Sequence, residues 1–143
     1  MKKRDILFTL LGVLLIGLVL LAAFQPRLKR RVESINCGNQ MSSLGCGARI
    51  WAEDNSNRLA DNFLVMSNEL CTPKFLICPS DQIRRPAESW ATFSTNTCSY
   101  EILRPGMPDT DWTNAYFRCL IHGHLGFADG TVFDGHRRRT KWP

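Results

Sequence analysis

The stretch "ILFTLLGVLLIGLVLLAAFQP", from Ile6 to Pro26, decides the architecture of this chain. Residues 6–24 contain no charged side chain. At about 1.5 Å per residue, a helix of this length is about 28 Å long, which is close to the thickness of the hydrocarbon core of a bilayer. We therefore predict a single transmembrane helix near the N-terminus.

A cleaved secretory signal is the alternative to a retained anchor. The apolar region of a signal peptide usually has about 7–15 residues and is followed by a cleavage site of small residues. Here Ala22 and Ala23 are followed by Phe24, Gln25 and Pro26, which make a poor cleavage site. The sequence favours the retained anchor, with the lipid bilayer as a partner.

Charge is distributed unevenly along the chain, whose net charge is +5. Residues 1–31 hold seven Lys and Arg against one Asp, and residues 32–135 hold seven against twelve Asp and Glu. Residues 136–143 form a basic tail, which we expect to be a solvated terminus rather than a lipid-binding segment. The predicted domain is therefore acidic, and we expect no nucleic-acid partner because a basic face is missing.

The side of the membrane on which the domain lies is indicated by two opposing signals. Basic residues flank both ends of the apolar segment, so the positive-inside rule slightly favours a cytoplasmic C-terminal domain. Six cysteines in a small domain are instead typical of an oxidising compartment. We expect a bacterial inner-membrane protein with one span and an extracytoplasmic domain.

Apolar residues continue at helical spacing beyond Pro26. Successive members of the set are four, three, four and three residues apart: Cys37, Met41, Leu44, Ala48 and Trp51. At about 100° per residue they form a stripe roughly 80° wide, which is one face of an amphipathic helix. We predict that this face packs on a sheet and that the helix ends at "EDNSN", residues 53–57.

The remaining segments are short. We predict a short helix over residues 61–70, strands within residues 73–79, 96–103 and 115–121, and a hairpin over residues 124–135. Asp129 and Gly130 form a two-residue turn in this prediction, which places Phe127 opposite Val132. The predicted fold is α+β: a long N-terminal helix, transmembrane in its first half and amphipathic in its second, packed on an antiparallel sheet of about four strands.

This arrangement resembles the type IV pilins and the type II secretion pseudopilins. The segment "FTLLGVLLIGLVLLAAFQP" is similar to the prepilin start, and Phe8, Thr9 and Leu10 match it. Leu7 stands where the prepilin peptidase expects Gly, and Gly12 stands where pilins carry Glu. The resemblance implies that processing, where it occurs, separates Leu7 from Phe8.

The soluble part resembles a group of pseudopilin-like proteins of planctomycetes and verrucomicrobia. The matching segments are "INCGNQMSSLGCGARIWAEDNSNRL", "VMSNELCTPKFLICPSD", "SYEILRPG" and "RCLIHGHLGFADGTV". The resemblance implies a non-enzymatic subunit of a type II secretion or type IV pilus-like assembly, with other pilin-like subunits as partners. It divides the chain into a membrane segment at residues 1–27, a pilin-like domain at residues 28–135 and the tail at residues 136–143.

The segment "CLIHGHLGF" brings Cys119, His122 and His124 close together. These residue types are zinc ligands, but in one continuous strand the two histidines would face away from the cysteine. A turn between the histidines would remove that conflict, and Cys78 or Cys98 is available as a further ligand. A membrane-tethered zinc-binding module is therefore the alternative function.

Other combinations of these side chains are weaker candidates. We expect at least one disulfide, with Cys98–Cys119 as the first choice, and the alternative is that the cysteines are buried thiols. A catalytic Cys119–His122 pair lacks an orienting third residue and an oxyanion hole, so we expect no enzyme. We expect no cofactor either.

The loop "MPDTDWTN" contains a further set of potential metal ligands, namely Asp109, Asp111 and Asn114. Oxygen ligands at this spacing can bind calcium. The loop lacks the Gly and the distal Glu of an EF-hand. We therefore favour a turn of solvated carboxylates over a calcium site.

Overall fold

The computed structural model describes residues 3–135, so the basic tail lies outside the described residues. The chain divides into two units, one reaching to Glu33 and the other beginning at Ser34. This division falls after the predicted boundary at residue 27. Each unit is described by itself below.

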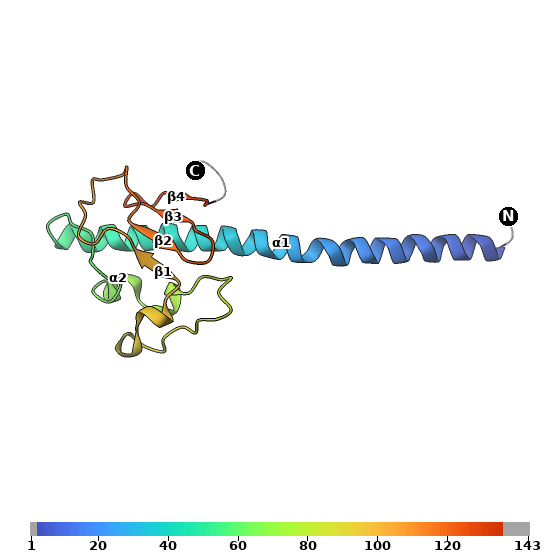
Figure 1. The fold of residues 1–143 in the computed structure, drawn as a ribbon, viewed down its shortest axis with the longest axis horizontal. Coiled ribbons are helices and arrows are strands. Elements are labelled where there is room, and N and C mark those ends of the chain that lie inside the picture. The colour runs from blue at the N-terminus through green and yellow to red at the C-terminus, as the bar shows by residue number, and fades with distance from the viewer. Residues whose placement is uncertain (1–2, 136–143) are drawn as a thin grey trace. The chain divides into compact units, whose positions relative to one another are not determined.

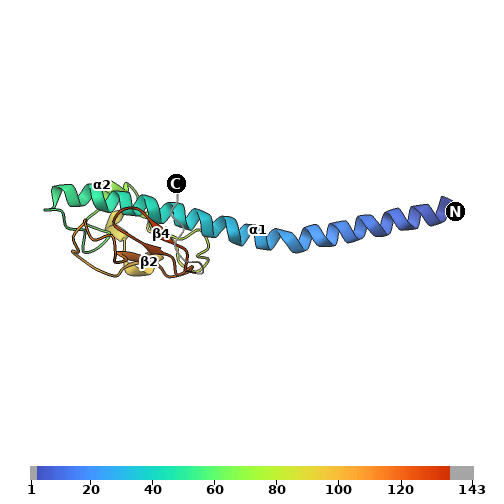
Figure 2. The same cartoon turned by 90° about the horizontal axis from the view of Figure 1, so that it is seen from above.

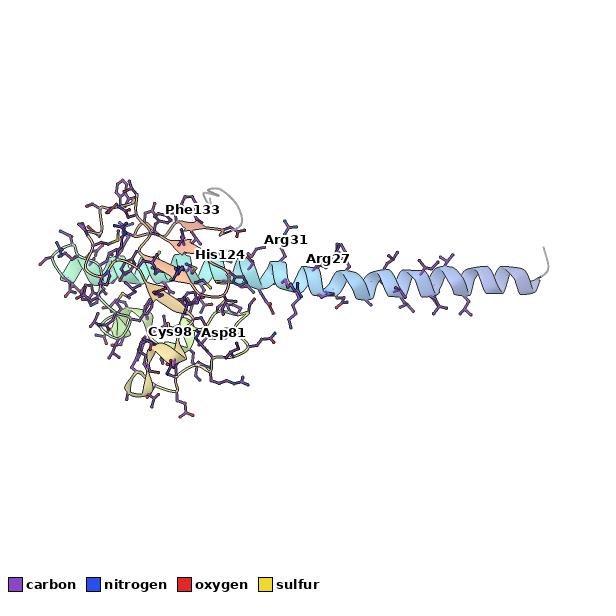
Figure 3. All side chains as sticks on the ribbon, viewed as in Figure 1. Arg27, Arg31, Asp81, Cys98, His124 and Phe133 are labelled. Atoms are coloured by element: carbon purple, nitrogen blue, oxygen red, sulfur yellow. The ribbon has the colours of Figure 1, made fainter. Side chains whose placement is uncertain are left out.

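The first unit consists of the first part of the helix α1, which spans Lys3–Asp54 and continues through Pro26. Over its most apolar window the mean hydropathy is 2.0, and it is the one helix among the described residues that is long and apolar enough to cross a membrane. The apolar side chains that the structure describes in this unit, from Leu11 on, are exposed, and the side chains of Arg27 and Arg31 project from the ribbon (Figure 3). The side chains of Leu7 and Phe8, at the expected processing site, lie outside the part that the structure describes.

In the second unit, the remainder of α1 forms one side of the core. Cys37, Met41, Leu44 and Ala48 are buried, as the predicted stripe requires. Trp51 is only partly buried, and the stripe continues through the fully buried Ala52 instead. Both views show strands of the sheet beside this part of the helix (Figure 1, Figure 2).

Four short strands form an antiparallel sheet in the order β1-β2-β3-β4. They are β1 (Tyr100–Ile102), β2 (Phe117–Cys119), β3 (Leu125–Gly126) and β4 (Val132–Phe133). The α+β prediction of a long helix and a four-stranded antiparallel sheet is confirmed. Each strand has two or three residues, so much of this unit is loop.

The hairpin between β3 and β4 differs from the predicted register by one residue. Gly126 lies opposite Val132, and the N–H of Phe127 donates to the carbonyl oxygen of Thr131 at 3.0 Å. The connection therefore has three residues, and its last residue, Gly130, has φ +79°. A three-residue connection ends in the left-handed region, which glycine adopts without strain, so the predicted two-residue turn is wrong.

The segment predicted as a strand over residues 73–79 instead forms the 3₁₀ helix η1 (Pro73–Leu76). Pro73 occupies the first helical position, and the hydroxyl of Thr72 accepts the N–H of Lys74 at 3.4 Å. Proline at this position and a capping hydroxyl both favour a helical turn. The strand prediction rested on the apolar run "FLI", and it is wrong.

The helix predicted over residues 61–70 is shorter than expected, because only α2 (Ser67–Leu70) is helical. Before it, the side chain of Asn62 accepts the N–H groups of Leu64 and Val65 and makes a turn. Such side-chain hydrogen bonds compete with a regular helix. Two further 3₁₀ turns, η2 (Trp90–Thr92) and η3 (Thr95–Thr97), precede β1.

Candidate metal centre

Four side chains converge inside the second unit: Cys37, Cys78, Cys119 and His122. Their potential ligand atoms all lie within 4.8 Å of one another. The three cysteines are completely buried, whereas His122 is partly exposed. We call this group the Cys–His cluster.

The cluster joins segments that are far apart in the sequence. Cys37 belongs to the buried stripe of α1, and Cys78 follows the turn η1. The side chain of Gln40, one turn after Cys37, donates to the carbonyl oxygens of Phe75 and Ile77, and the bond to Ile77 is 3.1 Å long. These bonds hold the Cys78 loop against the helix.

Cys119 and His122 form a Cys-x-x-His unit at the end of β2. The chain turns back there because the N–H of Gly123 donates to the carbonyl oxygen of Cys119 at 2.9 Å, and Gly123 has φ +68°. The N–H of His122 also donates to the sulfur of Cys119, at an N–S distance of 3.4 Å. This turn brings the His122 ring back over the cysteine.

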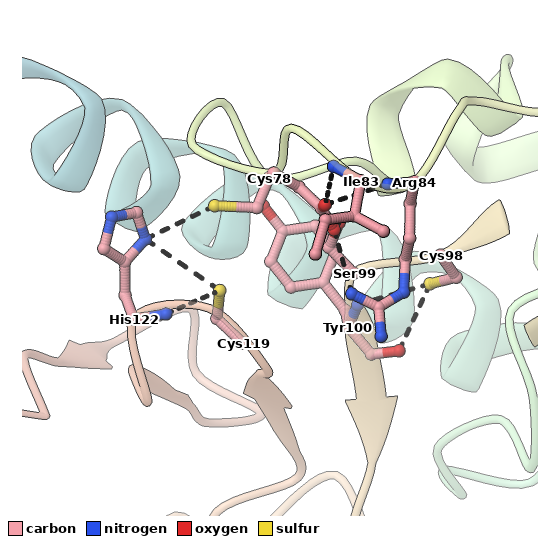
Figure 4. Close-up of polar contacts among 9 residues, drawn as sticks. Cys78, Ile83, Arg84, Cys98, Ser99, Tyr100, Cys119 and His122 are labelled. Carbon is pink, nitrogen blue, oxygen red and sulfur yellow. Dashed lines mark hydrogen bonds and ion pairs between the residues drawn. The ribbon is translucent and has the colours of Figure 1, made fainter. Parts of the chain in front are cut away.

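The Nδ1 atom of His122 is directed at two of the sulfur atoms (Figure 4). It lies 3.3 Å from the sulfur of Cys78 and 4.0 Å from that of Cys119. In a tetrahedral zinc site with bonds of about 2.3 Å to sulfur and 2.0–2.1 Å to nitrogen, this separation is about 3.6 Å. The two distances lie on either side of that value.

The three thiols differ in acidity. Hydrogen bonds to Cys119 and Cys78, together with burial, raise the pKa of Cys37 far above its usual value. The hydrogen bond to Cys119 also raises the pKa of Cys78, to about 11. Cys119 receives hydrogen bonds from both thiols and from the backbone N–H of His122, and these lower its pKa far below the usual value. These directions make Cys119 the most acidic of the three thiols.

The arrangement suits metal ligation better than nucleophilic catalysis. All three sulfur atoms belong to residues with no exposed surface, so a substrate has no access to them. A nucleophilic cysteine needs partial exposure, whereas the ligands of a structural metal site are enclosed. The cluster offers no orienting third residue for a Cys119–His122 pair among the described side chains.

His124, predicted as the third ligand, is not part of the cluster. Its Nε2 atom lies 3.0 Å from the hydroxyl of Ser34, and its Nδ1 atom accepts the N–H of Gly135 at 3.2 Å. Burial lowers its pKa, which favours a neutral ring. The ring stacks on that of His122 with centroids 5.0 Å apart, but both of its nitrogen atoms contact groups outside the Cys–His cluster.

The predicted disulfide between Cys98 and Cys119 is not formed, because all six cysteines are free thiols. The thiol of Cys98 donates to the carbonyl oxygen of Tyr100 at 3.2 Å (Figure 4). The sulfur of Cys119 instead belongs to the Cys–His cluster. Of the two further ligands considered from the sequence, Cys78 is in the cluster and Cys98 is not.

The helical spacing predicts Cys37 as a core residue and gives no indication that it is a candidate ligand. A small buried residue on a helix face satisfies the packing pattern by itself, so its spacing carries no signal for ligation. The signal is the residue type: Cys37 is the one member of the stripe that belongs to the usual zinc ligands. Only the fold places it beside Cys78 and Cys119.

In the loop with Asp109, Asp111 and Asn114, the carboxylate of Asp111 is hydrogen-bonded within the loop itself. One carboxylate oxygen of Asp111 accepts the N–H groups of Thr113 and Asn114, and the other accepts the side-chain amide of Asn114 at 2.9 Å. These bonds engage both oxygens of the Asp111 carboxylate in the turn. They support the prediction of a polar turn.

Comparison with known proteins finds no match: no family model fits the chain, and neither a curated protein nor a solved structure is significantly similar to it.

Proposed function

We propose that this chain is a non-enzymatic, membrane-anchored subunit of a type II secretion or type IV pilus-like assembly. The observation that carries the proposal is the helix α1, whose first part is apolar and whose second part forms the spine of a small α+β domain. Residues 6–24 contain no charge, so this part is suited to lipid or to neighbouring helices.

The exposed apolar side chains of the first unit indicate that this part of the helix lies in a hydrophobic environment. Val13 is 70% exposed, and Ile16, Val19 and Leu20 are each more than 60% exposed. A helix with apolar residues on all sides is typical of a membrane span. Bilayer lipid and the helices of other pilin-like subunits are therefore its proposed partners.

We place the protein in the bacterial inner membrane with the domain outside the cytoplasm. The support for this location is the resemblance to pilin-like domains. Disulfides do not contribute to it, because all six cysteines are free thiols. A fusion of alkaline phosphatase after residue 135 tests the orientation, since the enzyme is active only outside the cytoplasm.

The assembly role is tested by the intact mass and the N-terminal residue of the protein isolated from its native membrane. A chain that begins at Phe8 with a methylated amine supports an assembly helix released by the prepilin peptidase. A chain that still begins at Met1 contradicts processing and leaves a permanent anchor. The variant Leu7→Gly is the matched control, because it restores the residue that the peptidase expects.

One observation, the Cys–His cluster, favours the alternative of a metal-binding module. Its candidate ligands differ from the predicted set, because they include Cys37 and Cys78 and exclude His124. The cluster lies in the core of the domain. A metal held there leaves the outer surface free, so metal binding and a subunit role are compatible.

A further inference from the structure

We propose that Cys37, Cys78, Cys119 and His122 bind one zinc ion in a closed, structural Cys₃His site. This inference concerns the stability of the domain and goes beyond the anchoring and assembly role. It rests on the geometry of the four side chains and on the segments that they join.

The donor set selects the metal. Three sulfur atoms and one imidazole nitrogen form a soft set that suits zinc, and four ligands complete its tetrahedral coordination. Calcium and magnesium prefer oxygen ligands, and no carboxylate belongs to the group among the described residues. Zinc is therefore the ion that these side chains fit.

The geometry is close to that of a formed site. All ligand atoms lie within 4.8 Å of one another, and ligand atoms around a tetrahedral zinc ion are about 3.6–3.8 Å apart. Closing this difference requires rotations of the side chains and no rearrangement of the chain. The Nδ1 atom of His122 already contacts the sulfur atoms of Cys78 and Cys119.

The site is closed, which makes it structural. A catalytic zinc site keeps one position for water or substrate, whereas here four protein ligands fill the coordination sphere. The three cysteines have no exposed surface, so the ion would be shielded from solvent on that side. The fourth ligand, His122, is partly exposed.

Neighbouring groups offset the charge of the bound state. Binding replaces the protons of three thiols, so one zinc ion, three thiolates and a neutral imidazole carry a net charge of −1. The N–H of His122 already donates to Cys119, and the hydroxyl of Tyr100 lies 3.7 Å from the sulfur of Cys37. Hydrogen-bond donors of this kind around the ligands are typical of metal sites.

The bound ion would cross-link three segments of the domain that lie far apart in the sequence. It links α1, the loop after η1 and the end of β2, within a unit whose strands have two or three residues. Small domains with limited cores commonly depend on a metal or on disulfides. This domain has free thiols in place of disulfides.

The test is the metal content of the full chain, purified in detergent with a tag that contains no histidine. After incubation with zinc and removal of the free ion, we expect about one zinc ion per chain, measured by inductively coupled plasma mass spectrometry. X-ray absorption should show three sulfur neighbours at about 2.3 Å and one nitrogen neighbour at about 2.0–2.1 Å.

Four single variants and two controls identify the ligands. Cys37→Ser, Cys78→Ser, Cys119→Ser and His122→Gln should each lower the affinity for zinc at least about tenfold, because changing even a hydrogen-bond partner of a zinc ligand typically lowers metal affinity about 10–100-fold. The controls Cys98→Ser and His124→Gln replace a buried cysteine and a buried histidine that lie outside the Cys–His cluster, and we expect them to keep the metal.

Loss of metal through misfolding is separated from loss of a ligand by cobalt. In wild type, Co²⁺ should give the intense ligand-field bands of a tetrahedral site and thiolate-to-cobalt absorption. His122→Cys, which keeps four ligands, should retain these bands with a fourth thiolate. Folded wild-type protein that takes up neither ion overturns the proposal, as does equal loss of zinc in the ligand variants and the two controls. If the protein bound no metal but its N-terminus were processed, the zinc proposal would fail and the assembly role would still be supported.

Discussion

Asp81 shows what one residue contributes to the loop that carries Cys78. Its side chain is completely buried and pairs with the guanidinium of Arg84 at 3.0 Å. It also accepts the hydroxyl of Ser99 at 2.7 Å and the N–H of Ile83 at 3.0 Å. Burial alone would raise its pKa, but these hydrogen bonds outweigh burial and hold the pKa of Asp81 well below its usual value.

Replacing Asp81 should therefore destabilise the domain. We expect Asp81→Ala to lower the free energy of unfolding by about 2–4 kcal/mol at pH 7, because it leaves the hydroxyl of the buried Ser99 without this acceptor and removes the pairing with Arg84. The folded-state pKa of Asp81 lies below the unfolded value, so its contribution is present above about pH 4 and is lost as the pH falls further.

Denaturant unfolding of the full chain in detergent at pH 7 and at pH 3 measures both effects. The control is Glu101→Gln, in an exposed ion pair with Arg118, which should change stability by less than about 1 kcal/mol. If the difference between Asp81→Ala and wild type were the same at both pH values, this account of the Asp81 carboxylate would be contradicted.

At the scale of elements, two glycines of α1 have different surroundings. A Cβ atom on Gly45 would lie 3.0 Å from the Cα of Gly130 and 3.0 Å from the carbonyl oxygen of Phe127. A Cβ atom on Gly38 would meet nothing within 4 Å. The helix therefore needs glycine at position 45 to lie this close to the hairpin. At position 38 no neighbouring atom requires a glycine.

This contrast predicts opposite effects of one substitution. Gly38→Ala should stabilise the domain by about 0.5–1 kcal/mol, because alanine is the better helix former. Gly45→Ala should destabilise it by about 1–3 kcal/mol, because the backbone of the hairpin must move. Thermal and denaturant unfolding of the two variants provide the comparison, and equal effects would show that Gly45 does not set the packing distance.

For the whole molecule, the bound ion predicted here would act as a cross-link between the helix and the sheet. Removing zinc with a strong chelator should lower the Tm of the domain by about 10 °C or more, because a tightly bound ligand adds several kcal/mol to the stability of a domain of this size. Adding zinc back should restore the Tm of wild type.

Differential scanning fluorimetry of the full chain in detergent measures this shift. Cys98→Ser should respond to the chelator as wild type does, whereas Cys119→Ser should melt at one temperature with and without it. If neither the chelator nor added zinc changed the Tm of wild type, a structural role for the ion would be contradicted.

Features that depend on residues close in the sequence could be read from the sequence alone. The apolar segment, the amphipathic stripe from Cys37 to Ala48 and the α+β layout follow from hydrophobic periodicity, which is a local property. Hydrophobic periodicity did not predict the turn at η1 or the hairpin register. A proline at the first helical position favours the turn, and one glycine in the left-handed region ends the three-residue connection. Residue types also marked Cys119 and His122 as potential ligands.

The tertiary structure alone decided the composition of the Cys–His cluster. Cys37 and Cys78 are 41 positions apart along the sequence, and Cys119 is 41 positions further on, so no local pattern relates them. Packing of the helix against the Cys78 loop and the end of β2 brings the three sulfurs together, and the turn at Gly123 directs His122 toward them rather than His124. Ligation depends on distances in space, and only the folded chain sets those distances.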